Sequence, residues 1–186
     1  MKREISGMID GSLDSVVKVR GIMPQIEKAA KIMIDSLKNG NKIMTCGNGG
    51  SASQAMHFSG ELVGKFLVDR NPLASVCLNS DIVNMTAIGN DYGYEQIYRR
   101  QVEGIGKKGD VLVCFTTSGN SENLLRAVKN IKDIKVINLL GSGGGKMKGT
   151  GDVDIIVNSE QVPRIQECHL LILHILAKLI EDEFVK

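Results

Sequence analysis

The chain has 186 residues, enough for one domain that buries its own core. Its formal net charge is +2 and aromatic residues make up 4% of the chain, so it offers no broadly basic surface for nucleic acid and few rings for stacking bases. Glycine is the outlier, with 21 residues against a typical share of about 7%. These glycines indicate either low-complexity segments or backbone positions that exclude a side chain.

Neither the cysteines nor the termini indicate secretion or a membrane. The four cysteines are Cys46, Cys77, Cys114 and Cys168. Their spacing matches no zinc finger and no redox pair, so buried reduced thiols are expected. The first residues lack the apolar segment of a signal peptide, and the most apolar stretch, residues 170–180, is too short to span a bilayer. A cytoplasmic protein with neither a membrane nor a nucleic-acid partner is expected.

Apolar residues recur at helical spacing from Leu13 to Asn39, which predicts helix through this segment. Gly21 and Pro24 predict a break or kink, and Gly40 is typical of the residue that follows a helix C-terminus. We expect residues 1–40 to form a helical segment that serves oligomerisation. Residues 41–186 are expected to form an α/β core closed by a C-terminal helix, so that residues 1–186 make one domain.

Beyond residue 40, short apolar segments alternate with amphipathic ones. The predicted strands are Lys42–Cys46, Leu73–Leu78, Val111–Phe115, Lys135–Leu140 and Val153–Val157. The predicted helical stretches are Ser51–Lys65, a region around Asp81–Gly106, Ser121–Ile131 and Arg164–Phe184, with a glycine-rich connector at Gly141–Asp152 that has room for one short helix. Strands that are apolar throughout, separated by gaps too long for hairpins, predict a three-layer αβα sandwich around a five-stranded parallel sheet. Such sheets bind ligands beyond the carboxyl ends of their strands.

The first predicted strand is followed by a glycine loop, Gly47-Asn48-Gly49-Gly50-Ser51, that leads into a helix. With Ala52 it matches a variant of the dinucleotide fingerprint, but the acidic residue expected at the end of the second strand is not in place. No Gly-Lys-Ser/Thr follows, which excludes a P-loop. A phosphate-binding loop and a tight turn without a ligand are the two interpretations.

The third predicted strand is followed by a hydroxyl loop, residues 116–122, in which hydroxyl and amide side chains surround Gly119. It leads into a helix, whose first N–H groups favour an anion. This loop suits a phosphate monoester held without Lys or Arg, and the alternative is Ser121 as a helix N-cap with incidental polar neighbours. Two such loops in one small domain favour a shared ligand.

Two of the three histidines have neighbours typical of metal ligands. His57 and Glu61 are spaced i, i+4, and Gln166 and His174 are spaced i, i+8 on the closing helix. Imidazole, carboxylate and carboxamide groups suit a divalent metal such as zinc, whereas a plain surface pair is the alternative. Gln166 and His174 are about 12 Å apart along their helix, so convergence on one metal favours contributions from more than one chain. His169 lies off that face and is expected to pack or face solvent.

Five motifs occur in one order along nearly the whole chain. They are Cys46–Ser51, Met56–Phe58 with Glu61–Leu62, Ile88–Gly93, Thr117–Ser121 and Arg164–Glu167. Together they closely resemble the sedoheptulose 7-phosphate isomerases, or phosphoheptose isomerases, of the sugar isomerase (SIS) superfamily. The resemblance implies a flavodoxin-like SIS sandwich, assembled as a homotetramer with sites at subunit interfaces. It also implies conversion of sedoheptulose 7-phosphate to D-glycero-D-manno-heptose 7-phosphate, a precursor of bacterial surface heptose in lipopolysaccharide or capsule.

The resemblance further implies which residues form the site. Zinc ligands, with one ion per subunit, are expected at His57, Glu61, Gln166 and His174. Substrate-binding residues are expected at Asn48, Gly49, Gly50, Ser51, Glu61, Asn90, Asp91, Thr116, Thr117, Ser118, Ser121 and Gln166. Ketose–aldose isomerisation moves a proton between adjacent carbons through an enediol, and we expect Glu61 as the base and His174 as its acid/base partner.

Two positions depart from the family pattern. Thr116 stands where Ser is usual, and Val162-Pro163 stands where members often carry a polar residue. The competing interpretation is a non-catalytic SIS scaffold of the replication-initiator-associating type, which resembles this chain in the glycine loop but lacks the full catalytic set. The presence of Glu61 and His174 favours the enzyme. A sugar-phosphate sensor would need a fused DNA-binding segment, and the residues before the first strand are too few and not basic enough.

Overall fold

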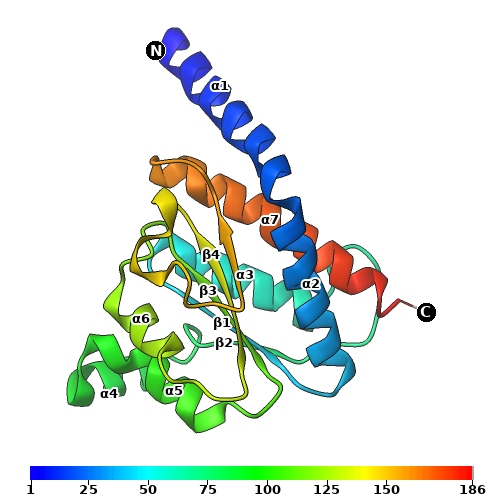
Figure 1. The fold of residues 1–186 in the computed structure, drawn as a ribbon, viewed down its shortest axis with the longest axis vertical. Coiled ribbons are helices and arrows are strands. Elements are labelled where there is room, and N and C mark those ends of the chain that lie inside the picture. Colours follow the sequence, from blue (N-terminus) through cyan, green and yellow to red (C-terminus); the bar gives the residue numbers. More distant parts are fainter. Residues whose placement is uncertain (186) are drawn as a thin grey trace.

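The computed structural model describes residues 1–185 (Figure 1). The helices are α1 (Lys2–Lys18), α2 (Met23–Lys38), α3 (Gly50–Val63), α4 (Ile82–Tyr92), α5 (Ile97–Ile105), α6 (Glu122–Val128) and α7 (Val162–Asp182). The strands are β1 (Ile43–Gly47), β2 (Ser75–Cys77), β3 (Val111–Phe115), β4 (Lys135–Leu140) and β5 (Val153–Ile156). Short 3-10 turns are η1 (Val19–Ile22), η2 (Tyr94–Gln96) and η3 (Ser142–Met147). All five predicted strands are confirmed, with small differences at their ends.

The five strands form one parallel sheet in the order β2-β1-β3-β4-β5. Because side chains alternate along a strand, Ile43 of β1 enters the core beneath α2, α3 and α7, whereas Met44 enters the core beneath α5 and α6. Helices therefore cover both faces of the sheet (Figure 1). The predicted three-layer sandwich is confirmed, and its strand order is the flavodoxin-like one.

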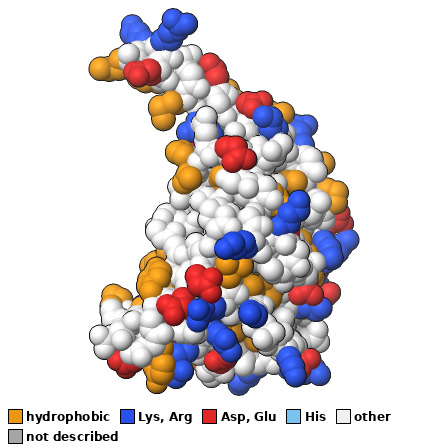
Figure 2. Space-filling model, turned by 60° about the vertical axis from the view of Figure 1, so that its left-hand side comes forward, with side chains coloured by type: hydrophobic (Ala, Val, Ile, Leu, Met, Phe, Trp, Pro, Cys, Tyr) orange, Lys and Arg blue, Asp and Glu red, His pale blue; other side chains and the backbone are white. Residues whose placement is uncertain are grey.

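The N-terminal segment is helical from Lys2, within the expected segment 1–40, although the helical spacing of apolar residues predicted helix only from Leu13. Gly7 and Gly11 lower the helix propensity of residues 1–12, although the apolar residues of this stretch keep helical spacing. The predicted break is confirmed, because η1 contains Gly21 and α2 begins just before Pro24. Helix α1 projects from the sandwich in Figure 1, and Figure 2 shows hydrophobic side chains exposed along this projection. Five of them are more than half exposed: Ile5, Met8, Ile9, Leu13 and Val17.

Two predicted helical stretches needed correction. The stretch Ser121–Ile131 is too long, because α6 ends at Val128 and Asn130 takes a positive φ of 60° that turns the chain. The region Asp81–Gly106 is divided at Gly93, whose φ is 91°. The glycine-rich connector contains only the short turn η3, as predicted.

The remaining polar groups of the core agree with the sequence analysis. All four cysteines are free and buried, and burial raises the pKa of the Cys46 thiol well above its ordinary value. His169 is fully buried, with Nε2 3.1 Å from the carbonyl oxygen of Leu140, so of the two expected alternatives, packing and solvent exposure, packing holds. Burial lowers the pKa of His169 to about 4, which keeps the imidazole neutral. Within residues 1–185, every helix is too short or too polar to cross a membrane.

Candidate active site

The strand order reverses between β1 and β3, and both predicted ligand loops follow these two strands. The glycine loop joins β1 to α3, and the hydroxyl loop joins β3 to α6. Strands that are parallel neighbours end at the same edge of the sheet, so the two loops lie side by side. This reversal point is where open α/β sheets bind ligands.

Two of the three glycines in the glycine loop leave no room for a side chain, and the third takes a backbone conformation that favours glycine. A Cβ on Gly47 would lie 2.6 Å from the carbonyl oxygen of Ser51, and a Cβ on Gly50 would lie 2.5 Å from Nε2 of Gln166. Gly49 takes a positive φ of 56°. Of the two explanations for the glycine content, backbone positions that exclude a side chain therefore hold for this loop.

Asn48 of the glycine loop is fixed by a network of side chains that come from other elements. Its amide exchanges two hydrogen bonds of 2.9 Å with the amide of Asn123 on α6. Its Oδ1 also accepts hydrogen bonds from the phenols of Tyr98 at 3.0 Å and Tyr94 at 3.2 Å. Burial raises the pKa of Tyr98, so its phenol stays protonated and remains a donor. Asn48 is thus oriented before any ligand binds.

Asn79, two residues beyond β2, fixes the backbone of the same loop. Its Oδ1 accepts the N–H of Gly47 at 3.2 Å, and its Nδ2 donates to the Gly47 carbonyl and to the Tyr98 phenol, each at 2.9 Å. Asn79, Tyr98 and Asn123 are site residues that were not predicted from the sequence. Only Asn79 carried a usable signal, because it follows a strand at the ligand-binding edge.

Two hydroxyl groups of the hydroxyl loop accept hydrogen bonds within the loop, and two others do not. Thr116 is buried and accepts the N–H of Gly119 at 3.2 Å, and Ser118 accepts the N–H of Asn120 at 3.2 Å. Within residues 1–185, the hydroxyls of Thr117 and Ser121 form no hydrogen bond to another residue. Ser121 occupies the N-cap position of α6, but its side chain makes no capping bond. The N-cap alternative therefore does not account for the Ser121 hydroxyl.

The glycine-rich connector after β4 packs directly against the hydroxyl loop. The N–H of Met147 donates to the Gly119 carbonyl at 3.0 Å, and the N–H of Lys146 donates to Oδ1 of Asn120 at 3.1 Å. A Cβ on Gly119 would overlap the carbonyl of Gly144. The connector thus supports the loop that faces the ligand edge.

The predicted pair Asn90 and Asp91 lies exposed at the end of α4, where Nδ2 of Asn90 donates to Oδ1 of Asp91 at 2.7 Å. Tyr94, in the turn that follows, reaches Asn48. The Tyr94 side chain therefore links the turn between α4 and α5 to the glycine loop, whereas Asn90 and Asp91 pair with each other.

Three of the four predicted metal ligands come together between α3 and α7. Ligand atoms of His57, Glu61 and His174 lie within 4.8 Å of one another, and we call these residues the α3–α7 cluster. Nε2 of His57 is 2.8 Å from Oε1 of Glu61, and the two imidazole rings meet edge to face at 5.1 Å. The cluster is partly open to solvent. Two imidazoles and a carboxylate with an open side are a donor set that suits a divalent cation such as zinc.

Gln166 lies apart from this cluster, at the other end of the same helix pair. Its side chain contacts Gly50, and its carbonyl accepts a hydrogen bond of 2.6 Å from Gln54. A shallow groove of about 390 Å³ between α3 and α7 has both Gln166 and His57 in its lining. Along α3, Glu61 is about 16 Å from Gly50. In one chain, therefore, the ligand loops and the cluster occupy opposite ends of α3.

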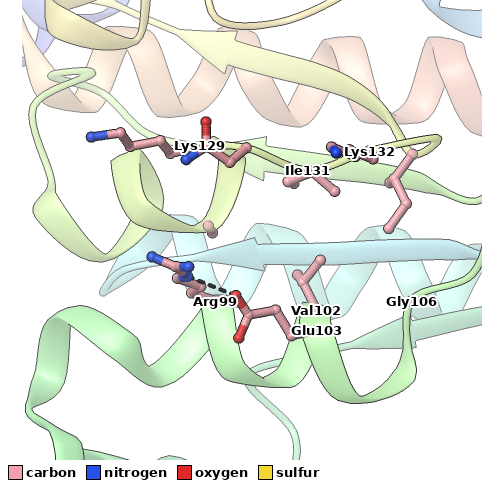
Figure 3. Close-up of a pocket in the computed structure, with 10 residues that line it drawn as sticks. Arg99, Val102, Glu103, Gly106, Lys129, Ile131 and Lys132 are labelled. Atoms are coloured by element: carbon pink, nitrogen blue, oxygen red, sulfur yellow. Dashed lines mark hydrogen bonds and ion pairs between the residues drawn. The ribbon is translucent and has the colours of Figure 1, made fainter.

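Another cavity, of about 200 Å³, lies between α5, α6 and the segment before β4 (Figure 3). Arg99 and Glu103 point toward each other there and form an ion pair of 2.8 Å. Lys129 and Lys132 line the same cavity. This cavity contains none of the predicted site residues. The segment that lines it leads into the start of β4, so the cavity lies at the sheet edge opposite the two ligand loops.

Comparison with known proteins identifies an SIS domain. The SIS domain family matches residues 12–144 of this chain. A phosphoheptose isomerase from Helicobacter hepaticus is 46% identical over 185 residues, covering 98% of this chain and 94% of the relative. Two solved phosphoheptose isomerases share the fold: that from Francisella tularensis at a TM-score of 0.93 and 37% identity, covering 97% of each chain, and that from Neisseria gonorrhoeae at 0.91 and 38%, covering 97% and 98%.

The chain belongs to the phosphoheptose isomerase family of SIS-domain proteins. The family resemblance read from the five sequence motifs is confirmed. The relatives match over nearly the full length of both chains, so the resemblance includes the N-terminal helix and the helix that carries His174.

Proposed function

We propose that this protein interconverts sedoheptulose 7-phosphate and D-glycero-D-manno-heptose 7-phosphate. The observation that carries the proposal is the α3–α7 cluster, where a carboxylate and two imidazoles meet in a chain of the phosphoheptose isomerase family. A non-catalytic scaffold has no need for such a cluster. The reaction places the protein among the aldose–ketose isomerases.

The chemistry needs one base and one acid/base partner. In the ketose, a base removes a proton from C1 to give the enediol, and the base then returns a proton to C2 while a second group moves the hydroxyl proton from the oxygen on C1 to the oxygen on C2. Glu61 is the base in this proposal, and His174 is the partner that serves the oxygens. Their ligand atoms are within 4.8 Å of each other, which is close enough for one substrate to contact both.

His57, Glu61 and His174 would hold a divalent cation, and zinc is the one whose ligand preferences they match. When bound, such an ion polarises a carbonyl group as a Lewis acid. Gln166 is the fourth ligand implied by the family resemblance. Gln166 and His174 are about 12 Å apart along α7, so a second subunit would relieve the strain of bringing both to one cation.

The two ligand loops bind the phosphorylated sugar in this proposal. Asn48, Gly49, Gly50 and Ser51 contribute the glycine loop, and Thr116, Thr117, Ser118 and Ser121 contribute the hydroxyl loop. The free hydroxyls of Thr117 and Ser121 supply neutral donors for phosphate oxygens. Asn90, Asp91, Glu61 and Gln166 complete the expected contacts with the sugar.

We also propose that the protein is a homotetramer with its sites at subunit interfaces, and that residues 1–40 serve its assembly. Helix α1 exposes an apolar stripe, and an apolar groove of about 460 Å³ lies between α1–α2 and α7. Arg164, at the start of α7, donates to the Met8 carbonyl and pairs with Glu167 at 2.6 Å. Ser12 of α1 donates to the same Glu167 at 2.8 Å. Assembly through α1 would thus act directly on the segment that holds Gln166.

A cytoplasmic location is the setting that best suits this chain, because four reduced, buried cysteines are typical of a reducing compartment. Its product would supply surface heptose for lipopolysaccharide or capsule. The statement about surface heptose rests on the family resemblance.

The decisive assay is incubation with sedoheptulose 7-phosphate in D₂O, followed by NMR, before and after treatment with a chelator. We expect the aldose to appear with deuterium at C2, because the proton held by Glu61 exchanges with solvent, and we expect the chelator to stop its formation. The absence of aldose under every condition, together with tight binding to a replication-initiator protein, would show that the scaffold alternative is correct.

A further inference from the structure

The segment between α3 and β2 is held against α7 by a buried ion pair. Glu181, in the last turn of α7, is fully buried and accepts backbone N–H groups from Phe66 and Leu67 at 2.9 Å and from Val68 at 3.1 Å. Nε of Arg70 lies 3.6 Å from the same carboxylate. Burial opposes the charge, but the three N–H donors and Arg70 outweigh it and hold the pKa of Glu181 below its ordinary value. The carboxylate is therefore charged at neutral pH.

Arg70 also holds the end of α3. Its guanidinium donates to the carbonyl of Glu61 at 2.7 Å, to that of Leu62 at 2.9 Å and to that of Asn71 at 3.0 Å. The last carbonyls of a helix have no partner within the helix, so these bonds replace the missing ones. The backbone of Glu61, whose side chain belongs to the cluster, is thereby fixed.

Phe66 connects the same segment to His174. The phenyl ring stacks on the imidazole with centroids 5.5 Å apart and an angle of 28° between the planes. His57 meets the same imidazole edge to face, so the ring of His174 is held between two aromatic neighbours. The backbone N–H of Phe66 is one of the three donors to Glu181, which lies about two turns beyond His174 on α7.

We propose that Glu181 and Arg70 form a brace that positions the α3–α7 cluster, Arg70 by fixing α3 at Glu61 and Glu181 by holding Phe66 against His174. Glu181, Arg70 and Phe66 are positioning residues, since none of them offers a ligand atom to the cluster. The inference rests on the proposed function, in that the cluster binds a divalent cation and transfers protons. Loss of the brace lowers cation affinity and kcat together. KM for the sugar phosphate stays near its normal value, because the ligand loops lie at the other end of α3.

The test compares Phe66→Leu, which removes the stack, with Phe66→Tyr, which keeps it. Leu67→Ala is the matched control, because Leu67 lies in the same segment and its side chain is 63% exposed. Co²⁺ affinity is measured on the metal-free protein by visible absorption, and kcat and KM are measured on the reloaded enzyme. We expect Phe66→Leu to weaken Co²⁺ binding and lower kcat by about tenfold each, and we expect Phe66→Tyr and Leu67→Ala to stay within about twofold of the parent protein.

Glu181→Gln provides the second test, with thermal unfolding measured alongside Co²⁺ binding. We expect the variant to lose Co²⁺ affinity by tenfold or more. The proposal is overturned if folded Glu181→Gln or Phe66→Leu binds Co²⁺ and turns over like the parent protein. If Glu181→Gln does not fold, the two Phe66 variants still decide. A parent protein that binds Co²⁺ in a Phe66-dependent way but makes no aldose would contradict the proposed function and leave the brace intact.

Discussion

The two ends of α3 differ in how completely their polar groups are paired within the chain. At its N-terminus, the glycine loop is closed by hydrogen bonds inside the chain, since Asn48 and the backbone of Gly47 are fully engaged by Asn123, Asn79 and Tyr98. Toward its C-terminus, His57 and Glu61 meet His174 at a partly open surface, and their ligand atoms face one another. The polar groups of the glycine loop are paired within the chain, whereas the cluster still has room for a cation, a substrate or another subunit.

This difference assigns substrate binding to the glycine and hydroxyl loops and the reaction to the cluster. A loop whose donors and acceptors are already paired keeps its shape and binds an anion through the few groups left over, such as Thr117 and Ser121. A cluster of ionisable groups that is only half-buried can exchange protons with a substrate. We therefore expect changes at the cluster to act on kcat and changes at the loop network to act on stability and KM. Variants at the cluster, the packed loops, His169 and Asn123 test this difference.

The largest effect is expected from the cluster itself. Glu61→Gln and His174→Gln each remove one acid/base group while preserving side-chain size, so kcat is expected to fall by about 10² to 10⁴-fold with an unchanged melting temperature. Glu160→Gln, at an exposed position, is the control and should keep the parent rate. Rates are followed by NMR with sedoheptulose 7-phosphate. A purified Glu61→Gln or His174→Gln protein with near-normal turnover would sink the assignment of that residue.

The next effect is on stability, at the packed loops. Gly119→Ala would place a Cβ on top of the Gly144 carbonyl, and alanine is also strained at the Gly119 φ of 64°. We therefore expect the free energy of unfolding to drop by about 3 kcal/mol. Gly149→Ala is the matched control, because its φ is 84° but no atom lies within 4 Å of the added Cβ. That variant should lose only about 1 kcal/mol. Urea unfolding measures both, and equal losses would show that packing at Gly119 is unimportant.

A comparable effect is expected from pH, through the buried histidine of α7. His169 has a pKa of about 4 in the folded protein, against 6.5 as its ordinary value. Between those values the unfolded chain binds the extra proton, so the folded protein loses stability as pH falls from 6.5 toward 4, by about 3 kcal/mol in total. Urea unfolding at pH 7 and pH 4.5 measures the slope. His169→Gln should flatten it, and an unchanged slope would mean that other groups control this range.

The smallest effect is expected at Asn123, which touches Asn48 but not the cluster. Asn123→Ala removes the paired amide, so Asn48 loses its fixed orientation and KM should rise by about tenfold while kcat changes little. Asn158→Ala, at an exposed position after β5, serves as the control. Steady-state kinetics with the sugar phosphate separate the two constants. A fall in kcat without a rise in KM would place Asn123 in the reaction rather than in binding.

The sequence predicted those features that depend on short-range pattern. Strands β3 and β4 were placed to the residue because they are uninterrupted apolar runs. His57 and Glu61 were paired correctly because an i, i+4 spacing decides that contact within one helix. The fold follows from the alternation of such segments, and the family from the order of five motifs.

The missed features depend on contacts between distant parts of the chain. Asn79 and Asn123 are neutral residues with no spacing that marks them, and they become site residues only when β2 and α6 pack beside the glycine loop. Glu181 and Arg70 are likewise unremarkable charges until α7 covers the end of α3. Gln166 was predicted to be a fourth ligand, with helix geometry placing it about 12 Å from His174, and its contact with Gly50 was not predicted.

The most direct test of the contrast asks whether the loops and the cluster that serve one substrate come from different subunits. Glu61→Gln has intact loops, and the double variant Asn48→Ala/Ser118→Ala has an intact cluster. The two proteins are unfolded together, refolded as a mixture and assayed at a sedoheptulose 7-phosphate concentration at which neither turns over alone. Shared sites predict that the mixture regains about a quarter of the parent activity, because random assembly joins an intact loop pair to an intact cluster in about a quarter of the sites. A mixture that stays as inactive as its two components would contradict sites shared between subunits.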